Sequence, residues 1–261
     1  MIKYLMIKKY LKSLVPKEFI WALLDIIKPN VFGQLGEDAV IENHLSWLGL
    51  DINKKGMYVD IGAFHPTRGS NTFKFYKKGS MGYAIDVGKK KKRLWKILRP
   101  RDIFINTAVV NNSYKEEFVD FIMRDGYGAM TDYVKKRGVI KETIYHRKNM
   151  TKIKATKANE ICNIITNDSR WSIAPWKFIT IDIEGMDEFF IKDLDLKKLA
   201  PDVLAIEYFI PKQISYLDKI KYLSNCDLIL NLKTKGYALQ SICGPTLILV
   251  RVQSKDLILR R

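Results

Sequence analysis

The sequence predicts an α/β fold with a mostly parallel, Rossmann-like sheet, and three observations predict it. Short apolar runs that end in an acidic residue alternate with segments of helical periodicity between residues 57 and 207. Glycine or proline ends several of the predicted helices. Two apolar runs at 237–242 and 246–252 are spaced to form an antiparallel hairpin that closes the sheet.

The chain has 261 residues, enough for one large domain, which we place at 31–261 after a basic helical extension at 1–30. Residues 1–28 alternate apolar residues with lysines, and Pro16 divides them into two predicted helices. The apolar stretch is too short to span a bilayer, and no cleavage site follows it. We expect this segment to pack on the main domain; the alternative is peripheral contact with an anionic membrane.

A net charge of +17 favours acidic partners such as nucleic acid, anionic lipid or phosphorylated substrates. Most lysines are scattered, and the dense block at 89–93 lies in a predicted helix, so we favour a solvated face over a nucleic-acid patch. No RNA-binding or zinc-finger signature accompanies the block. The three cysteines are far apart, which indicates a reducing, cytoplasmic location and no structural zinc.

The functional prediction depends on the first strand and its loop, residues 57–71. Val59 and Ile61 suit a buried strand, and Asp60 and Gly62 come where its carboxyl end would lie. Ligands bind at that edge of open α/β sheets. Gly62 would let a cofactor approach the backbone, and Asp60 offers a hydrogen-bond acceptor.

The same pattern of strand, acid and helix then repeats. The interval from Asp60 to Asp86 suits one β-α-β unit, in which the second acid can hold both hydroxyls of a ribose. The glycine-rich loop that a pyrophosphate requires is missing, so S-adenosylmethionine fits better than a nicotinamide dinucleotide. The elements expected here are a helix at 39–48 after the turn 33–38, a helix at 72–78, a strand at 81–86, a helix at 89–98 and a strand at 102–110.

A second acidic region follows the predicted strand 176–182. Asp182 and Glu184 stand at alternate positions, which on a strand puts both carboxylates on one face. Such a pair can act as a base with its partner, orient a hydroxyl or bind a divalent cation. The remaining expected elements are strands at 116–123 and 151–156 that elaborate the sheet edge, a helix at 159–165, a strand at 201–209 containing Glu207, and a helix at 213–223.

These pieces together resemble the FkbM-type S-adenosylmethionine-dependent methyltransferases. The resemblance extends from about residue 31 to 252 and rests on GQLGED at 33–38, YVDIGAFHP at 58–66 with SNT at 70–72, GYAID at 82–86, IDIEGMD at 181–187 and PDVLAIE at 201–207. It implies a class I methyltransferase fold and methyl transfer to an oxygen, often a sugar hydroxyl in glycan biosynthesis. The chain departs from the family pattern at Val87, where proline is frequent.

The resemblance also implies roles for particular residues. Asp60 and Gly62 would line the methionine end of the cofactor, Asp86 would bind the ribose and Asn106 would lie near the adenine. Three residues of the N-terminal turn would close the pocket. The cofactor-binding residues predicted in this way are Gln34, Glu37, Asp38, Asp60, Gly62, Ala63, Asn71, Asp86, Asn106 and Asp182.

For catalysis, we expect either Asp182 or His65 to be the base, with Glu184 beside Asp182. A divalent metal at Asp182, Glu184 and Glu207 is a lesser alternative, and no metal is predicted. The acceptor would be a sugar, a glycan or another small hydroxylated molecule, selected by the loops 123–147 and 209–213. Two other interpretations stay open: an NAD-binding oxidoreductase, and a non-catalytic module that binds nucleosides or nucleic acid.

Overall fold

The computed structural model describes residues 31–124, 127–130, 150–184, 186–208 and 215–252. The expected helical extension at 1–30 lies outside these ranges, as do the loop 209–213 and most of the loop 123–147. Within the described ranges, no helix is long and apolar enough to cross a membrane.

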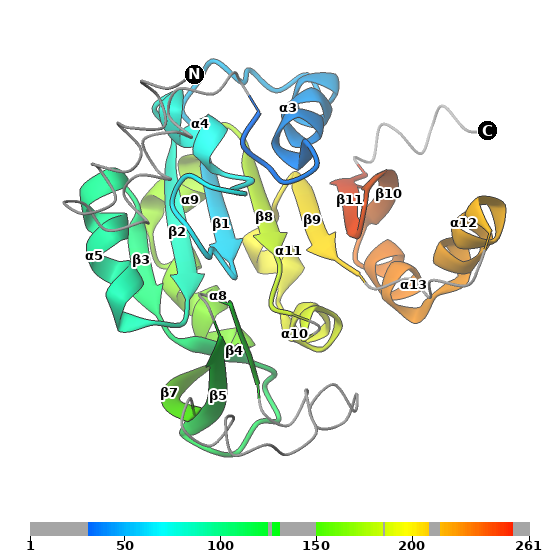
Figure 1. The fold of residues 1–261 in the computed structure, drawn as a ribbon. Coiled ribbons are helices and arrows are strands. Elements are labelled where there is room, and N and C mark those ends of the chain that lie inside the picture. Colours follow the sequence, from blue (N-terminus) through cyan, green and yellow to red (C-terminus); the bar gives the residue numbers. More distant parts are fainter. Residues whose placement is uncertain (1–30, 125–126, 131–149, 185, 209–214, 253–261) are drawn as a thin grey trace, which may run out of the picture.

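A seven-stranded sheet forms the centre of the fold, in the order β10-β11-β9-β8-β1-β2-β3 (Figure 1). The five strands from β9 to β3 are parallel, and β11 runs antiparallel to both β9 and β10. The sheet is therefore mostly parallel and compatible with the predicted Rossmann-like fold, and the expected C-terminal hairpin is present. Its strands are β1 (Met57–Ile61), β2 (Met81–Asp86), β3 (Ile103–Asn106), β8 (Lys177–Ile181), β9 (Val203–Glu207), β10 (Tyr237–Cys243) and β11 (Thr246–Arg251).

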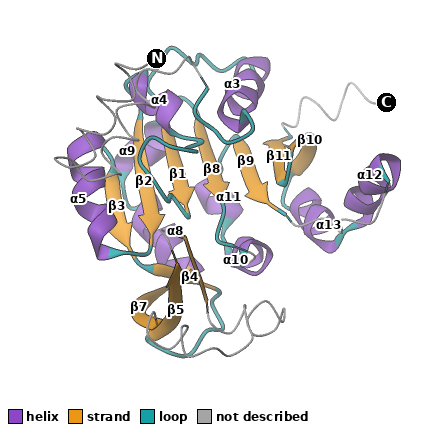
Figure 2. Cartoon of the chain, viewed as in Figure 1, coloured by secondary structure: helices purple, strands orange, loops and turns teal. Residues whose placement is uncertain are grey.

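Helices cover both faces of this sheet (Figure 2). All five residues of β1 are buried, because alternate side chains point to opposite faces and each face is covered. Val59 packs on the side of α8 to α13, and Tyr58 packs on the side of α3 and α4. The helices are α3 (Glu37–Trp47), α4 (Phe73–Lys77), α5 (Lys89–Leu98), α8 (Ala158–Thr166), α9 (Ser169–Ile173), α10 (Asp187–Asp193), α11 (Leu196–Leu199), α12 (Tyr216–Asn225) and α13 (Asp227–Thr234).

The chain from 102 to 110 corrects one expectation, since it forms two strands in two different sheets. It leaves the main sheet at Thr107, whose hydroxyl donates to the Lys154 carbonyl at 2.7 Å and lies 2.7 Å from the Thr156 hydroxyl. The next residues form β4 (Ala108–Val110), which belongs to a separate four-stranded sheet in the order β4-β7-β5-β6. The other strands of that sheet are β5 (Phe118–Arg124), β6 (Tyr127–Met130) and β7 (Met150–Lys157).

The sequence predicted that these strands would extend the edge of the main sheet. The structure corrects this prediction, because they form a separate sheet. Figure 1 shows it beyond the arrowheads of the central strands, next to their carboxyl ends. It has a small core of its own around Val110, Val119 and Ile153. The insertion is therefore placed to cover whatever lies at the carboxyl edge of the main sheet.

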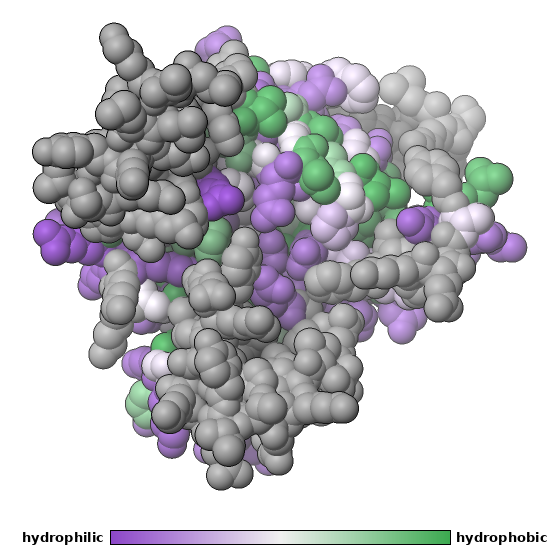
Figure 3. Space-filling model, viewed as in Figure 1, coloured by the Kyte–Doolittle hydropathy of each residue, from purple (hydrophilic) through white to green (hydrophobic). Residues whose placement is uncertain are grey.

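Helix α3 and the segment before it pack against the C-terminal hairpin. His44 Nε2 lies 2.8 Å from Ser241 Oγ, and the Leu35 side chain covers the Gly244 turn so closely that an added Cβ there would lie 2.1 Å from it. Leu35 and Trp47 are nevertheless largely exposed. On the face drawn in Figure 3, apolar side chains gather in the region where α3 and the hairpin lie. The first and last described parts of the chain are thus joined.

Gly62 fixes the spacing between β1 and β8. Its φ is +84°, and a Cβ at this position would lie only 1.7 Å from the carbonyl oxygen of Asp182. The amide of Gly62 donates to the Ile85 carbonyl at 2.8 Å, and that of Asp182 donates to the Ile61 carbonyl at 2.9 Å. Glycine is needed here because three strands meet at the same edge, a reason that differs from the cofactor approach expected from the sequence.

We expect Gly62→Ala to lower the free energy of unfolding by more than about 3 kcal/mol, because strain in the left-handed region and a backbone clash act together. Gly49→Ala is the matched control, since Gly49 also has a positive φ (+73°) but no atom within 4 Å of an added Cβ. It should cost only about 1–2 kcal/mol. Urea denaturation of both variants tests this; equal losses would show that the clash is relieved without cost.

Candidate functional site

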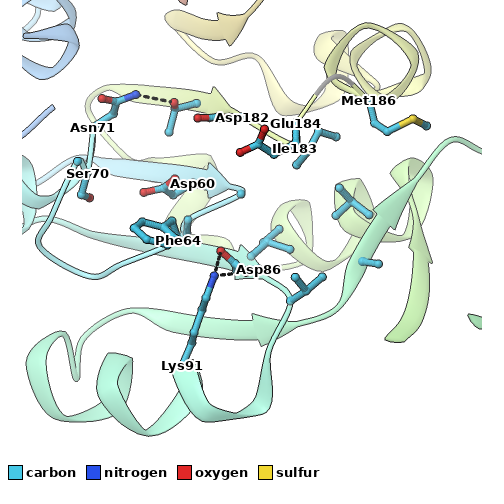
Figure 4. A pocket seen from close by; sticks show the side chains of 18 of the residues that line it. Asp60, Phe64, Ser70, Asn71, Asp86, Lys91, Asp182, Ile183, Glu184 and Met186 are labelled. Carbon is cyan, nitrogen blue, oxygen red and sulfur yellow. Dashed lines mark hydrogen bonds and ion pairs between the residues drawn. The ribbon is translucent and has the colours of Figure 1, made fainter. Parts of the chain in front are cut away.

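A cavity lies at the carboxyl edge of the main sheet, where the ends of β1, β2 and β8 meet the small sheet (Figure 4). Its walls come from the loop after β1, the end of β2, the start of α5, the segment after β8, and residues of β4 and β5. Parallel strands place their carboxyl ends together, so acids that are far apart in sequence meet here. The lining residues include seven predicted from the sequence to bind a cofactor: Gln34, Asp60, Gly62, Ala63, Asn71, Asp86 and Asp182.

Asp60 lies in the wall of this cavity and is held by a relay of side chains. Its Oδ2 accepts a hydrogen bond from the Thr72 hydroxyl at 2.6 Å, and that hydroxyl in turn accepts one from Arg99 Nη1 at 2.9 Å. Burial raises the pKa of Asp60 from 3.8 to about 6, although the hydrogen bond from Thr72 and the charge of Arg99 oppose the rise. The carboxylate is thus ionised at neutral pH but at a cost in stability.

Arg99 has no exposed surface and organises the loop after β1. Its Nη1 also donates to the Pro66 carbonyl at 3.1 Å and to the Ser70 hydroxyl at 3.2 Å. Its Nη2 donates to the Tyr58 hydroxyl at 2.8 Å and lies 2.6 Å from the Asp102 carboxylate. Arg99 is not among the residues predicted from the sequence; its signal there is an acid three residues later, at the spacing of a local ion pair.

Asp86 ends the neighbouring strand β2 and forms an ion pair with Lys91. Lys91 Nζ lies 2.9 Å and 3.0 Å from the two carboxylate oxygens and 4.9 Å from the centre of the Phe64 ring. Figure 4 shows Lys91 reaching from α5 to Asp86. Burial raises the pKa of Asp86, and Lys91 opposes that rise. The sequence placed the whole 89–93 block on a solvated face. Lys91 instead reaches into the cavity, where a ligand that hydrogen-bonds to Asp86 would compete with it.

The acids after β8 are arranged differently from the expectation. The strand ends at Ile181, and Glu184 has a φ of +54°, so the alternation of an extended strand does not apply to Asp182 and Glu184. Both residues line the cavity, but the hydrogen-bonding partner of the Asp182 side chain is Glu207 at the end of the neighbouring β9. Burial and the charge of Asp182 raise the pKa of Glu184, and burial raises that of Asp182.

Two residues of the cavity wall have strained backbones. Phe64 (φ +28°) and Glu184 (φ +54°) are non-glycine residues with positive φ, and both line the cavity. Such conformations cost about 1–3 kcal/mol each and persist only where the surroundings enforce them. They are concentrated at binding and catalytic sites, so their place here supports a functional role for the cavity.

Four predicted site residues lie outside the cavity wall. Glu37 accepts a hydrogen bond from the Leu35 amide, and Asp38 one from the Phe32 amide, each at 2.8 Å, so both hold the N-terminal turn. Asn106 ends β3 beside Asp86, and its Oδ1 is buried with no hydrogen-bond partner among the described residues. The fourth residue is His65.

His65 is buried within the loop after β1. Its Nδ1 accepts hydrogen bonds from the amides of Thr67 at 3.2 Å and Arg68 at 3.1 Å. These bonds shape the loop in the way that an Asx turn does, with an imidazole nitrogen in place of a carboxylate oxygen. The Nδ1 atom of the ring therefore stabilises the conformation of this loop.

In the part of the chain that the structure describes, no group of three or more His, Cys, Asp or Glu residues is placed to hold a metal ion. No protein-family model matches the chain, and a search of curated proteins finds no match.

Asp60→Asn tests the cost of the buried carboxylate. A folded pKa raised from 3.8 to about 6 contributes stability that is present below pH 4 and is lost as the pH rises through about 6, a total of about 3 kcal/mol. Asparagine does not titrate, so Asp60→Asn should gain stability relative to wild type as the pH rises from 4.5 to 7.5. Urea denaturation across this range measures the difference, and a constant difference would contradict the raised pKa.

Proposed function

We propose that the chain is an S-adenosylmethionine-dependent methyltransferase that acts on a hydroxyl of a sugar, a glycan or another small acceptor. One observation carries the proposal: the cavity is acidic although the chain has a net charge of +17. Four carboxyl groups line it, those of Asp60, Asp86, Asp182 and Glu184, and among the described lining residues the basic side chain is that of Lys91. Such a wall favours a cationic ligand over an anionic one.

The cavity suits the chemistry of this cofactor in two respects. A sulfonium and an ammonium group are both cations, and carboxylates at the ends of β1 and β8 are suitable partners for them. A ribose needs an acceptor at the end of β2, and Asp86 is there, with Lys91 to be displaced or re-oriented on binding. A mostly parallel sheet closed by an antiparallel hairpin is also the arrangement expected of a class I methyltransferase.

A dinucleotide fits the same cavity less well. A pyrophosphate carries two negative charges and is usually bound by backbone amides at a glycine-rich helix N-terminus. Here the corresponding loop contains Phe64 and His65 between Gly62 and Gly69, and the facing wall is acidic. These features support the methyl donor over a nicotinamide cofactor.

Bound S-adenosylmethionine supplies a methyl group that its sulfonium has already activated. The chain must then align an acceptor hydroxyl and remove its proton. We assign the removal of this proton to Asp182, because its carboxylate lines the cavity next to Glu184. Phe121 from the small sheet also lines the cavity, and its apolar side chain would limit the access of water there.

Cofactor binding is the first test. S-adenosylmethionine should raise the melting temperature of the protein, and calorimetry should detect its binding. NAD should have neither effect. Asp86→Asn should weaken binding by about 10-fold, the effect of losing charge-assisted hydrogen bonds worth about 1.5 kcal/mol. Asp120→Asn is a matched control, since Asp120 does not line the cavity. Stabilisation by NAD alone would reject the proposal. Labelled cofactor incubated with lysate glycans and nucleotide sugars would then reveal the acceptor.

Two variants distinguish the candidate bases. Asp182→Asn should lower turnover by about 10²–10⁴-fold, because a general base is lost. His65→Asn should retain most of the turnover, because its side-chain oxygen can accept the bonds from the Thr67 and Arg68 amides. Rates at saturating cofactor measure both effects. Loss of turnover in His65→Asn with the cofactor still bound, and little loss in Asp182→Asn, would assign the proton to His65 instead.

A further inference from the structure

Asp182 and Glu207 meet at the ends of two neighbouring strands. In the register of β8 with β9, Ile181 is opposite Ile206, so the next residue of each strand arrives at the same place on the sheet edge. Their carboxyl groups lie close enough for a hydrogen bond between them, and Glu207 Oε2 is buried with no other hydrogen-bond partner among the described residues. Two ionised carboxylates have only acceptors, so this bond requires one of the two groups to carry a proton.

We propose that Glu207 is a positioning residue that carries this proton at neutral pH and donates it in a hydrogen bond to Asp182, which is thereby kept as an oriented carboxylate. The inference rests on the proposed function, in which Asp182 removes the proton of the acceptor hydroxyl. Glu207 itself does not line the cavity, so it acts through Asp182.

The surroundings of Glu207 explain why the proton stays on it. The strongest effects of charge on it come from Asp182, Asp187 and Glu184, which are acidic, and the Asp187 carboxylate accepts a hydrogen bond from the Ile183 amide at 2.8 Å. Burial and these negative charges raise the pKa of Glu207 to about 9. Asp182 is favoured as the ionised partner, because the hydrogen bond from Glu207 and one from the Glu184 amide both stabilise its charge.

In this arrangement one proton is transferred to Asp182 in each turnover. Asp182 takes the hydroxyl proton while the acceptor oxygen bonds to the methyl carbon and the carbon–sulfur bond breaks, with its electron pair remaining on sulfur. Glu207 keeps its own proton throughout. The proton on Asp182 then passes to solvent, which restores the pair to one proton before the next turnover.

A titration without ligand tests the pair directly. Full-length protein carrying ¹³C-labelled carboxyl groups on Glu and Asp should show one glutamate that titrates near pH 9, and its signal should be missing from Glu207→Gln. If the Glu207 signal titrates near its ordinary value, the inference is overturned. This readout does not depend on methyl transfer, so a titration near 9 in a protein that binds no S-adenosylmethionine would reject the function and retain the pair.

Two variants then test the link to turnover. Glu207→Gln can donate the same hydrogen bond from its amide but cannot ionise, so turnover at pH 7.5 should stay within about 3-fold of wild type and the decline above pH 9 should disappear. Glu207→Leu is the matched control, since it is neutral and cannot donate. Its kcat should fall by at least about 10-fold with little change in cofactor affinity. The rise of its pH–rate profile on the acidic side should move to higher pH, because Asp182 loses a hydrogen bond that stabilises its charge.

Equal losses in Glu207→Gln and Glu207→Leu would overturn the inference, because the donated bond would then be irrelevant. An alkaline limb that persists in Glu207→Gln would also overturn it. Circular dichroism and melting curves of both variants separate these outcomes from failure to fold, and the wild-type titration decides the question even if neither variant folds.

Discussion

Arg99 is the charge on which the carboxyl edge of the sheet depends, because a guanidinium with no exposed surface must find all its partners inside the protein. Its donors reach Asp102, Tyr58 and the loop from Pro66 to Thr72 at once, and the Trp95 ring lies 4.5 Å from its centre. Removing any one partner would leave a buried charge undersatisfied. The loop after β1 is thereby fixed, and with it the position of the Asp60 carboxylate.

The cavity concentrates features that a stable protein otherwise avoids. Buried carboxylates with raised pKa values and two strained backbones surround the same space, in a chain whose remaining charge is strongly positive. Each feature costs stability, and Arg99 and Lys91 offset part of the electrostatic cost. Local violations of this kind are expected where function selects the residues. Together these features are stronger evidence that the acidic cavity is a functional site than any single sequence motif.

Two features of the fold form this cavity. The parallel strands β1, β2, β8 and β9 bring acids from distant positions to one edge, which is a consequence of topology. The small sheet contributes Phe121 to the cavity wall, which is a consequence of the break at Thr107. The proposed methyl transfer needs both: charged groups to hold and deprotonate the reactants, and a cover that limits water.

The sequence by itself determined the alternation of strands, strand-end acids and helices, the closing hairpin, and eight of the residues in the cavity wall, because local periodicity and strand-end acids are encoded within a few neighbouring residues. Only the tertiary structure decided which distant groups meet. It pairs Asp182 with Glu207, because the register of β8 with β9 brings the two strand ends together, and the positive φ of Glu184 ends the alternation that the sequence implied. It also turns Lys91 and Arg99 inward, since their partners, Asp86 and the loop after β1, lie in other elements. Such partnerships depend on packing between elements, which no local pattern records.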